Sequence, residues 1–257
     1  MAAVTLAEVE DLYRPYKQKR RTRATVAKEK GLEPLALAIF AQDGSDPATL
    51  ANDYIDPEKG VETVEDALAG ASDIIAETIS DDADIRKSLR LLANAKGHAG
   101  SKAAKEDEDS VYRMYYEFAQ PLNKLQSHQV LALNRGEREG FLKVSLDIPR
   151  DLALDRIWKR VLKPGSPATE FVRAAAEDGY DRLIEPSLER EIRSALTDEA
   201  NESAIRNFAL NLKPLLMQPP VKGHVTMGLD PGYRMGCKVA VVDGTGKVLD
   251  TTGVYPT

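Results

Sequence analysis

The sequence is poor in the residues that build disulfide-linked or metal-stabilised folds. Cys237 is its one cysteine, and its three histidines, His98, His128 and His224, lie far apart along the chain. A single cysteine excludes a disulfide framework and a cysteine-based zinc cluster. Scattered histidines argue against a histidine-rich metal site. We therefore expect neither a metal nor a cofactor.

Long apolar segments are also missing. The longest candidate, residues 32–41, contains Glu33 and Pro34. No run approaches the roughly 18 apolar residues that a membrane-spanning helix needs. The N-terminus does not show the basic segment followed by an apolar stretch that marks a secretory signal peptide. We expect a cytoplasmic protein with no membrane contact.

Charge is abundant and unevenly distributed. The 257 residues include 35 Lys and Arg against 41 Asp and Glu, which gives a formal net charge of −6. Residues 14–30 hold eight basic residues and one acid, whereas residues 41–84 hold thirteen acids and one base. These two segments either neutralise each other in the fold or face different partners.

Helical patterns dominate the first 220 residues. Apolar residues recur at helical spacing in residues 6–16, 61–79 and 85–92. The polar, glycine-containing residues 97–110 are predicted to form a loop or linker, and with it a boundary inside the helical region. Thr197, which two acids follow, is predicted to begin a further helix.

Two shorter patterns concern local packing. Ala27, Gly31 and Leu37 fit the spacing of a helix-turn-helix, in which glycine permits the turn. The aromatic residues of segment 112–118 are spaced as on a helix and are predicted to lie in the core.

Strand patterns occur at two places. Residues 142–148 alternate apolar and polar side chains, which is typical of a half-buried strand. After residue 220, residues 225–230, 238–243 and 247–255 read as strands, the last two joined by a glycine-rich turn. Three such strands do not make a stable domain alone. We expect them to open a domain whose remainder is absent.

Two longer passages carry a family resemblance. Residues 6–23 read LAEVEDLYRPYKQKRRTR, and residues 227–243 read MGLDPGYRMGCKVAVVD. Together with residues 127–136, 182–191 and 211–220, they resemble the Tex family of bacterial transcription accessory proteins. The resemblance covers essentially the whole chain.

This resemblance implies both fold and organisation. We expect a mainly α protein: residues 1–220 would form a multi-helical scaffold with helix-turn-helix-like elements and one short β insertion. Residues 221–257 would supply the first three strands of a truncated ribonuclease H-like (YqgF) α/β domain. Complete members continue into a helix-hairpin-helix region and an OB-fold RNA-binding domain, which we expect this fragment to lack.

Asp230 is the residue that bears on catalysis. It ends an apolar strand, and in ribonuclease H-like enzymes and resolvases an aspartate at the equivalent place helps to hold Mg²⁺. That chemistry needs several carboxylates converging on the metals, and the resemblance supplies only this one. We expect Asp230 to cap its turn and the chain not to be an enzyme.

The best nucleic-acid candidate is a basic run between two predicted helices. Clustered cations attract phosphates, and nearby tyrosines can stack on bases. The run consists of Lys17, Lys19, Arg20, Arg21 and Arg23, with Tyr13 and Tyr16 beside it. The alternative is a solvated face that pairs with the acidic residues 43–84.

Three hypotheses for function remain open. The first is a non-catalytic transcription accessory factor that binds RNA, with DNA as a further ligand. The second is a Mg²⁺-dependent nuclease or resolvase in the complete protein, which depends on Asp230. The third is an interaction scaffold whose acidic residues 43–84 face RNA polymerase or the ribosome.

Overall fold

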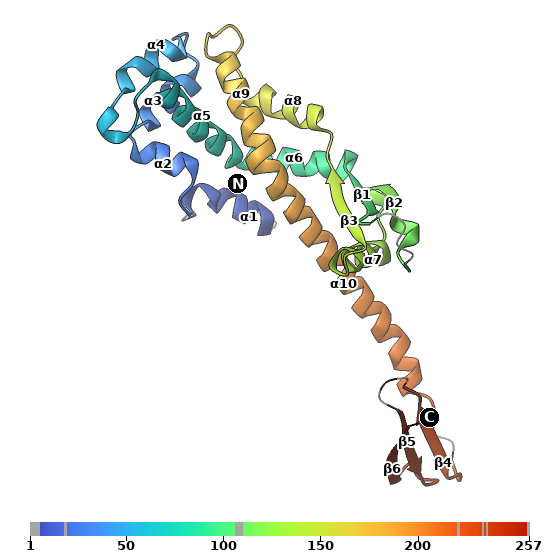
Figure 1. Ribbon diagram of the computed structural model, residues 1–257. Helices are drawn as coiled ribbons and strands as arrows, with labels where there is room; N and C mark the ends of the chain where they lie inside the picture. Colours follow the sequence, from blue (N-terminus) through green and yellow to red (C-terminus); the bar gives the residue numbers. More distant parts are fainter. Residues whose placement is uncertain are drawn as a thin grey trace. The chain divides into compact units, whose positions relative to one another are not determined.

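The chain forms two compact units, Met1–Ser203 and Ala204–Thr257. The computed structural model describes residues 6–17, 20–105, 110–219, 222–232, 234 and 236–255. Most of these residues are helical and the remainder includes two small sheets, so the expected fold class is confirmed (Figure 1). The division falls within a helix, and the domain boundary expected at residue 220 stays a prediction.

The helices begin at residues whose side chains cap them. Thr22 and Asp82 each accept a hydrogen bond from a backbone N–H of the first turn, and Thr63 forms a capping box with Asp66. The α-helices are α1 (Leu6–Tyr13), α2 (Arg23–Glu29), α3 (Glu33–Ala41), α4 (Pro47–Ala51), α5 (Val64–Ser80), α6 (Ala83–Lys96), α7 (Ser127–Arg138), α8 (Arg150–Val161), α9 (Thr169–Gly179) and α10 (Glu185–Leu216).

Short helical turns connect several of these elements. The 3₁₀ turns are η1 (Arg14–Tyr16), η2 (Asn52–Tyr54), η3 (Pro57–Lys59), η4 (Arg113–Tyr115) and η5 (Leu122–Lys124), and a π-helical segment, η6 (Tyr180–Ile184), joins α9 to α10. Of the helices in the described ranges, none is both long and apolar enough to cross a membrane.

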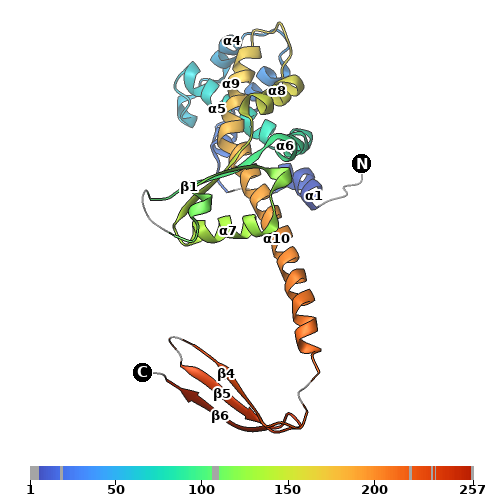
Figure 2. The ribbon, with the colours of Figure 1, turned by 90° about the vertical axis from the view of Figure 1, so that its right-hand side faces the viewer.

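Each unit contains one antiparallel three-stranded sheet. In the first unit the order is β2 (Glu117–Pro121), β1 (His98–Ala103), β3 (Leu142–Asp147). In the second it is β4 (Thr226–Asp230), β5 (Cys237–Val242), β6 (Val248–Val254) (Figure 2). The strands predicted near residues 142–148 and after residue 224 are confirmed.

The prediction of a loop at residues 97–110 is wrong for the first half of this segment. That half forms β1, the central strand of its sheet. This strand pairs with β2 on one side and β3 on the other. Only Ala99 and Ser101 are buried along it, and these small side chains leave no apolar alternation for the sequence to display. Residues 106–109 lie outside the described residues.

Two helix predictions also need correction. The aromatic segment 112–118 forms η4 and the start of β2 rather than a helix, although Tyr112 and Tyr115 are buried as expected. Thr197 lies inside α10. Its hydroxyl donates to the Arg193 carbonyl oxygen, four residues back, at 2.7 Å, which is the hydrogen bond of a threonine inside a helix and not that of an N-cap.

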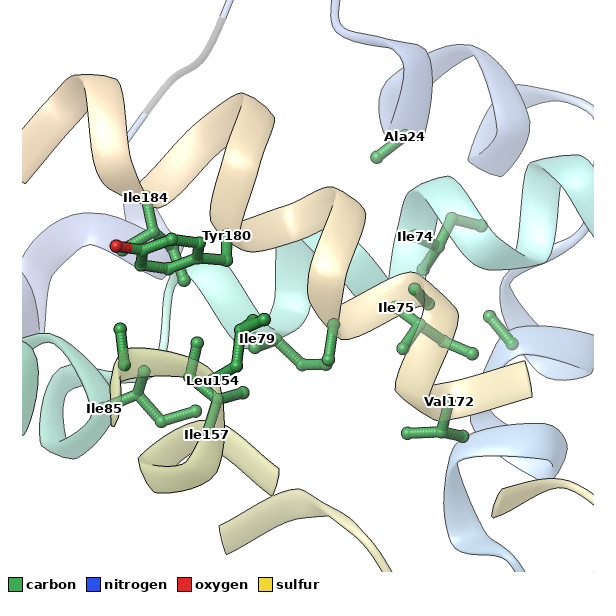
Figure 3. Close-up of a cluster of buried hydrophobic side chains, with 14 of the residues drawn as sticks. Ala24, Ile74, Ile75, Ile79, Ile85, Leu154, Ile157, Val172, Tyr180 and Ile184 are labelled. Atoms are coloured by element: carbon green, nitrogen blue, oxygen red, sulfur yellow. The ribbon is translucent and has the colours of Figure 1, made fainter. Parts of the chain in front are cut away.

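The main core is centred on α5, which packs against α2, α3 and α9. Ile75, Ile79 and Leu154 are among its fully buried side chains (Figure 3). Gly179 brings α9 close to α5, because a Cβ at this position would lie 3.0 Å from the carbonyl oxygen of Ala76. A larger residue at this position would therefore require α5 or α9 to shift by a few tenths of an ångström.

The helix pair expected near Gly31 is present. Gly31 adopts φ of 84° between α2 and α3, a conformation that glycine adopts without strain. Ala27 and Leu32 are buried beside the turn, whereas Leu37 is exposed. A nucleic-acid-reading role for this pair stays a prediction.

A buried ion network joins α1, α6 and α10. Arg86 is 1% exposed; its Nε donates to Asp11 Oδ1 at 2.9 Å and its Nη2 to Ser187 Oγ at 3.1 Å. Arg90 donates to Asp11 Oδ2 at 2.6 Å and also bonds Glu191. A buried charge is tolerated only where partners compensate it, so α1 is held against α6 by these contacts.

The network turns the apolar side of α1 outward. Asp11 is buried, whereas Leu6, Val9 and Leu12 are at least half exposed. The apolar spacing of residues 6–16 therefore marks a surface of the first unit.

We expect Asp11→Asn to lower the free energy of unfolding by about 3 kcal/mol, because it leaves the buried Arg86 guanidinium without its main carboxylate. Urea denaturation followed by the fluorescence of the single tryptophan, Trp158, would report on the first unit.

The control is Lys87→Ala, which breaks the exposed contact of Lys87 with Glu8 at 2.7 Å. Its denaturation midpoint should stay nearly unchanged. Equal losses for the two variants would contradict a dominant role for the buried network.

Candidate nucleic-acid interface

The basic run lies on the connection between α1 and α2. Pro15 ends α1 by starting η1, and Thr22 caps α2 by accepting from the Thr25 backbone N–H at 3.0 Å. Lys17 and Arg20 therefore belong to an irregular connection, and Arg23 opens a helix. Gln18 and Lys19 are outside the described residues, so the predicted role of Lys19 stays a prediction.

The described cations of this run are all exposed: Lys17, Arg20, Arg21 and Arg23. Arg21 pairs with Glu29 at 3.2 Å, between two largely exposed side chains. Contacts of that kind are weak. For Lys17 and Arg20, no ion pair with a carboxylate of the described residues is found. Their charge is available to an anion.

Two tyrosines accompany these cations. Tyr13, at the end of α1, is 58% exposed and Tyr16, at the end of η1, is 80% exposed. Exposed aromatic rings next to cations form the surface on which single-stranded nucleic acids stack. The first unit thus presents both elements of such a surface on one connection.

The acidic segment draws its partners from other elements. Asp82 and Asp84 pair with Arg160 of α8 at 3.0 and 2.6 Å, and Asp73 pairs with Arg182 of η6 at 2.9 Å. From the basic segment, Arg14 contacts Asp81 at 3.4 Å. The basic and acidic segments are therefore paired through Arg14, whereas Arg20 takes no part in this pairing among the residues that the structure describes.

A groove beside the run carries mixed charge. Its volume is ≈ 520 Å³, and Lys17 and Lys28 line it together with Glu77, Asp81 and Asp82. This volume lies within the range of ligand pockets, about 300–1,000 Å³. Carboxylates repel phosphates. A nucleic-acid strand would therefore follow the outer side of the run rather than enter this groove.

Asp230 lies exposed at the end of β4, in register with Lys238 of β5. Among the described residues, no group of three or more His, Cys, Asp or Glu side chains is placed to hold a metal ion. Mg²⁺ needs several oxygen ligands because it dehydrates reluctantly. The described residues around Asp230 therefore do not fit a two-metal nuclease site.

No sequence pattern indicated another polar cluster, which lies around Arg90 and Asn94 of α6. Its members come from α6, η5, α7 and α10 and surround a cavity of ≈ 430 Å³. Because these elements are far apart in the chain, neither spacing nor a motif could have indicated it.

Comparison with known families identifies the scaffold. Residues 42–208 match the Tex central region-like family, and residues 224–257 match the Tex protein YqgF-like domain. The fold is thus a helical central region followed by a YqgF-type sheet. Since the first match covers more than half of the chain, the chain belongs to the Tex family.

Curated relatives extend along nearly the whole chain. The uncharacterized protein YdcI of Bacillus subtilis is 49% identical over 259 residues, 99% of this chain and 36% of that protein. The transcriptional accessory protein Tex of Neisseria gonorrhoeae is 37% identical over 263 residues, 99% and 34% of the two chains. The human S1 RNA-binding domain-containing protein 1 is 32% identical over 269 residues, 98% and 27%. The chain spans about a third of the length of the curated relatives it matches.

Proposed function

We propose that this chain supplies an RNA-binding surface to a transcription accessory protein. The observation that supports the proposal is the exposed set of cations on the connection from α1 to α2, with Tyr13 and Tyr16 beside them. The cations would release counterions from the phosphates, and the rings would stack on bases.

The names of two relatives support the same proposal. One is called a transcriptional accessory protein and the other an S1 RNA-binding domain-containing protein. Because this chain covers about a third of such relatives, the whole protein's activity, its cytoplasmic location and any contact with RNA polymerase or the ribosome are also proposals.

The chemistry of the surface favours binding without sequence preference. Contacts to phosphates position a strand but do not read its bases, and stacking accepts every base. Single-stranded DNA would therefore bind as well, through the same cations. RNA is the proposed ligand because of the relatives' names, not because the site contains a group that selects the 2′-hydroxyl.

We expect replacement of Lys17, Arg20, Arg21 and Arg23 by Ser to weaken binding of a fluorescein-labelled oligouridine about tenfold or more at low salt. The slope of log K against log salt should fall by about 3, because each phosphate contact with a single strand contributes about 0.7. Fluorescence anisotropy between about 50 and 200 mM salt measures both quantities.

A matched control removes the same charge from another surface of the first unit. It replaces the exposed Lys102, Arg113, Lys124 and Lys143 by Ser and should leave both affinity and salt slope nearly unchanged. Equal effects of the two variants would mean that net charge, rather than this run, governs binding.

We expect Tyr16→Ala to weaken oligouridine binding about tenfold, since stacking on one base is worth about 1–3 kcal/mol. Tyr16→Phe keeps the ring and should bind like the parent chain in the same anisotropy assay. A loss of similar size in both variants would indicate that the hydroxyl, not the ring, makes the contact.

We further propose that the chain is not a nuclease, because Asp230 is exposed and has no converging carboxylates among the described residues. Labelled RNA and a labelled four-way DNA junction are incubated with Mg²⁺ and either the parent chain or Asp230→Asn. The two proteins should give the same band pattern on denaturing gels. Cleavage that needs Mg²⁺ and disappears in Asp230→Asn would overturn this proposal.

A further inference from the structure

The first unit contains a second concave site, separate from the basic run. It is a cavity of ≈ 430 Å³ bounded by residues of α6, η5, α7 and α10; α6, α7 and α10 are labelled in Figures 1 and 2. Its floor includes Leu122, Val130 and Ile192, which are each 6% exposed. The volume is near the lower end of ligand pockets, which hold about 300–1,000 Å³, and the apolar floor favours an apolar group.

The charged side chains that line the cavity are Arg90, Glu191 and Glu199. Arg90 is already engaged, because it donates to Asp11 Oδ2 at 2.6 Å and bonds Glu191. Glu199 is exposed, and within the described ranges its carboxylate has neither a hydrogen bond nor an ion pair. The cavity therefore offers one uncompensated negative charge.

Two side-chain amides also line the cavity. Asn94 of α6 and Asn123 of η5 are exposed, and their amides bond no other side chain or backbone group in the described part of the chain. An asparagine amide has two N–H donors and a carbonyl acceptor, which is the complement of a peptide group. The lining thus combines an apolar floor, two amides and a carboxylate.

This combination selects among occupants. A nucleic-acid strand would bring phosphates towards the unpaired Glu199, which is unfavourable in a partly enclosed site. An apolar molecule would fill the floor but would form no hydrogen bond with the two amides and no ion pair with the carboxylate. A peptide with an apolar side chain next to a cation satisfies all three kinds of group.

We propose that this cavity is a docking site for a protein segment in which a leucine-sized side chain adjoins a lysine or arginine. The apolar side chain covers Leu122 and Ile192, the asparagine amides bond the peptide backbone, and the cation pairs with Glu199. This site is independent of the basic run, so it can exist whether or not the run binds RNA.

The test titrates the full ¹⁵N-labelled chain with three capped tetrapeptides at millimolar concentration, followed by amide chemical shifts. The peptides are acetyl-Gly-Leu-Lys-Gly-amide, the charge-reversed acetyl-Gly-Leu-Glu-Gly-amide and the apolar-deleted acetyl-Gly-Ser-Lys-Gly-amide. We expect the first peptide to shift the amide signals of Asn123, Leu125 and Ala195. The other two peptides should bind about fivefold more weakly, because each lacks either the ion pair or the apolar contact.

Variants separate specific docking from surface adsorption. Ala195→Trp places a large side chain at an exposed lining position, and it should abolish the shifts. Glu199→Gln should equalise the lysine and glutamate peptides, whereas the control Glu202→Gln changes an exposed carboxylate of α10 that does not line the cavity and should keep the difference. Circular dichroism of each variant checks that α10 is intact.

Three results would overturn the proposal. The first is equal binding of the lysine and glutamate peptides to the parent chain. The second is a set of shifts that survives Ala195→Trp in a folded variant. The third is the absence of any shift at the cavity up to the solubility limit of the lysine peptide.

Discussion

The burial of one guanidinium, that of Arg86, constrains the first unit more than any apolar contact does. A charge that is 1% exposed must find compensation inside the protein. The compensation comes from Asp11 on α1 and from Ser187 and Glu191 on α10. The planar guanidinium presents its N–H donors in a fixed arrangement, so its partners must lie in defined positions. The network therefore sets the orientation of α1.

That orientation decides which side of α1 faces solvent. With Asp11 turned inward, Leu6, Val9 and Leu12 face outward. The same rotation leaves Tyr13 exposed, and η1 then carries Tyr16 and the basic run into solvent. An α1 packed by its apolar stripe would bury Tyr13 and leave Asp11 unpaired at the surface. The candidate nucleic-acid surface is thus a consequence of the buried ion pair.

The sequence predicts those parts of the fold in which each element shows its own periodicity. Residues 64–80 carry an unbroken helical stripe, and residues 142–147 alternate cleanly, so α5 and β3 were predictable. β1 was not predictable, because its buried residues are the small Ala99 and Ser101. It is held in the sheet by backbone pairing with β2 and β3. The cations of the candidate interface were predictable from their clustering. The contacts of Arg86 were not, since they join residues 75 to 105 positions apart.

Arg90 links the two proposed surfaces within the first unit. Its guanidinium lines the cavity between α6 and α10, yet one of its partners is Asp11 of α1, two residues before Tyr13. If Arg90 lacked that partner, Glu191 would be the carboxylate left to compensate both Arg86 and Arg90, and the cavity would become less negative. The helix that leads into the basic run therefore also keeps the cavity negative. The buried network therefore bears on both sites, because it holds the helix that precedes the basic run and compensates the cation that lines the cavity.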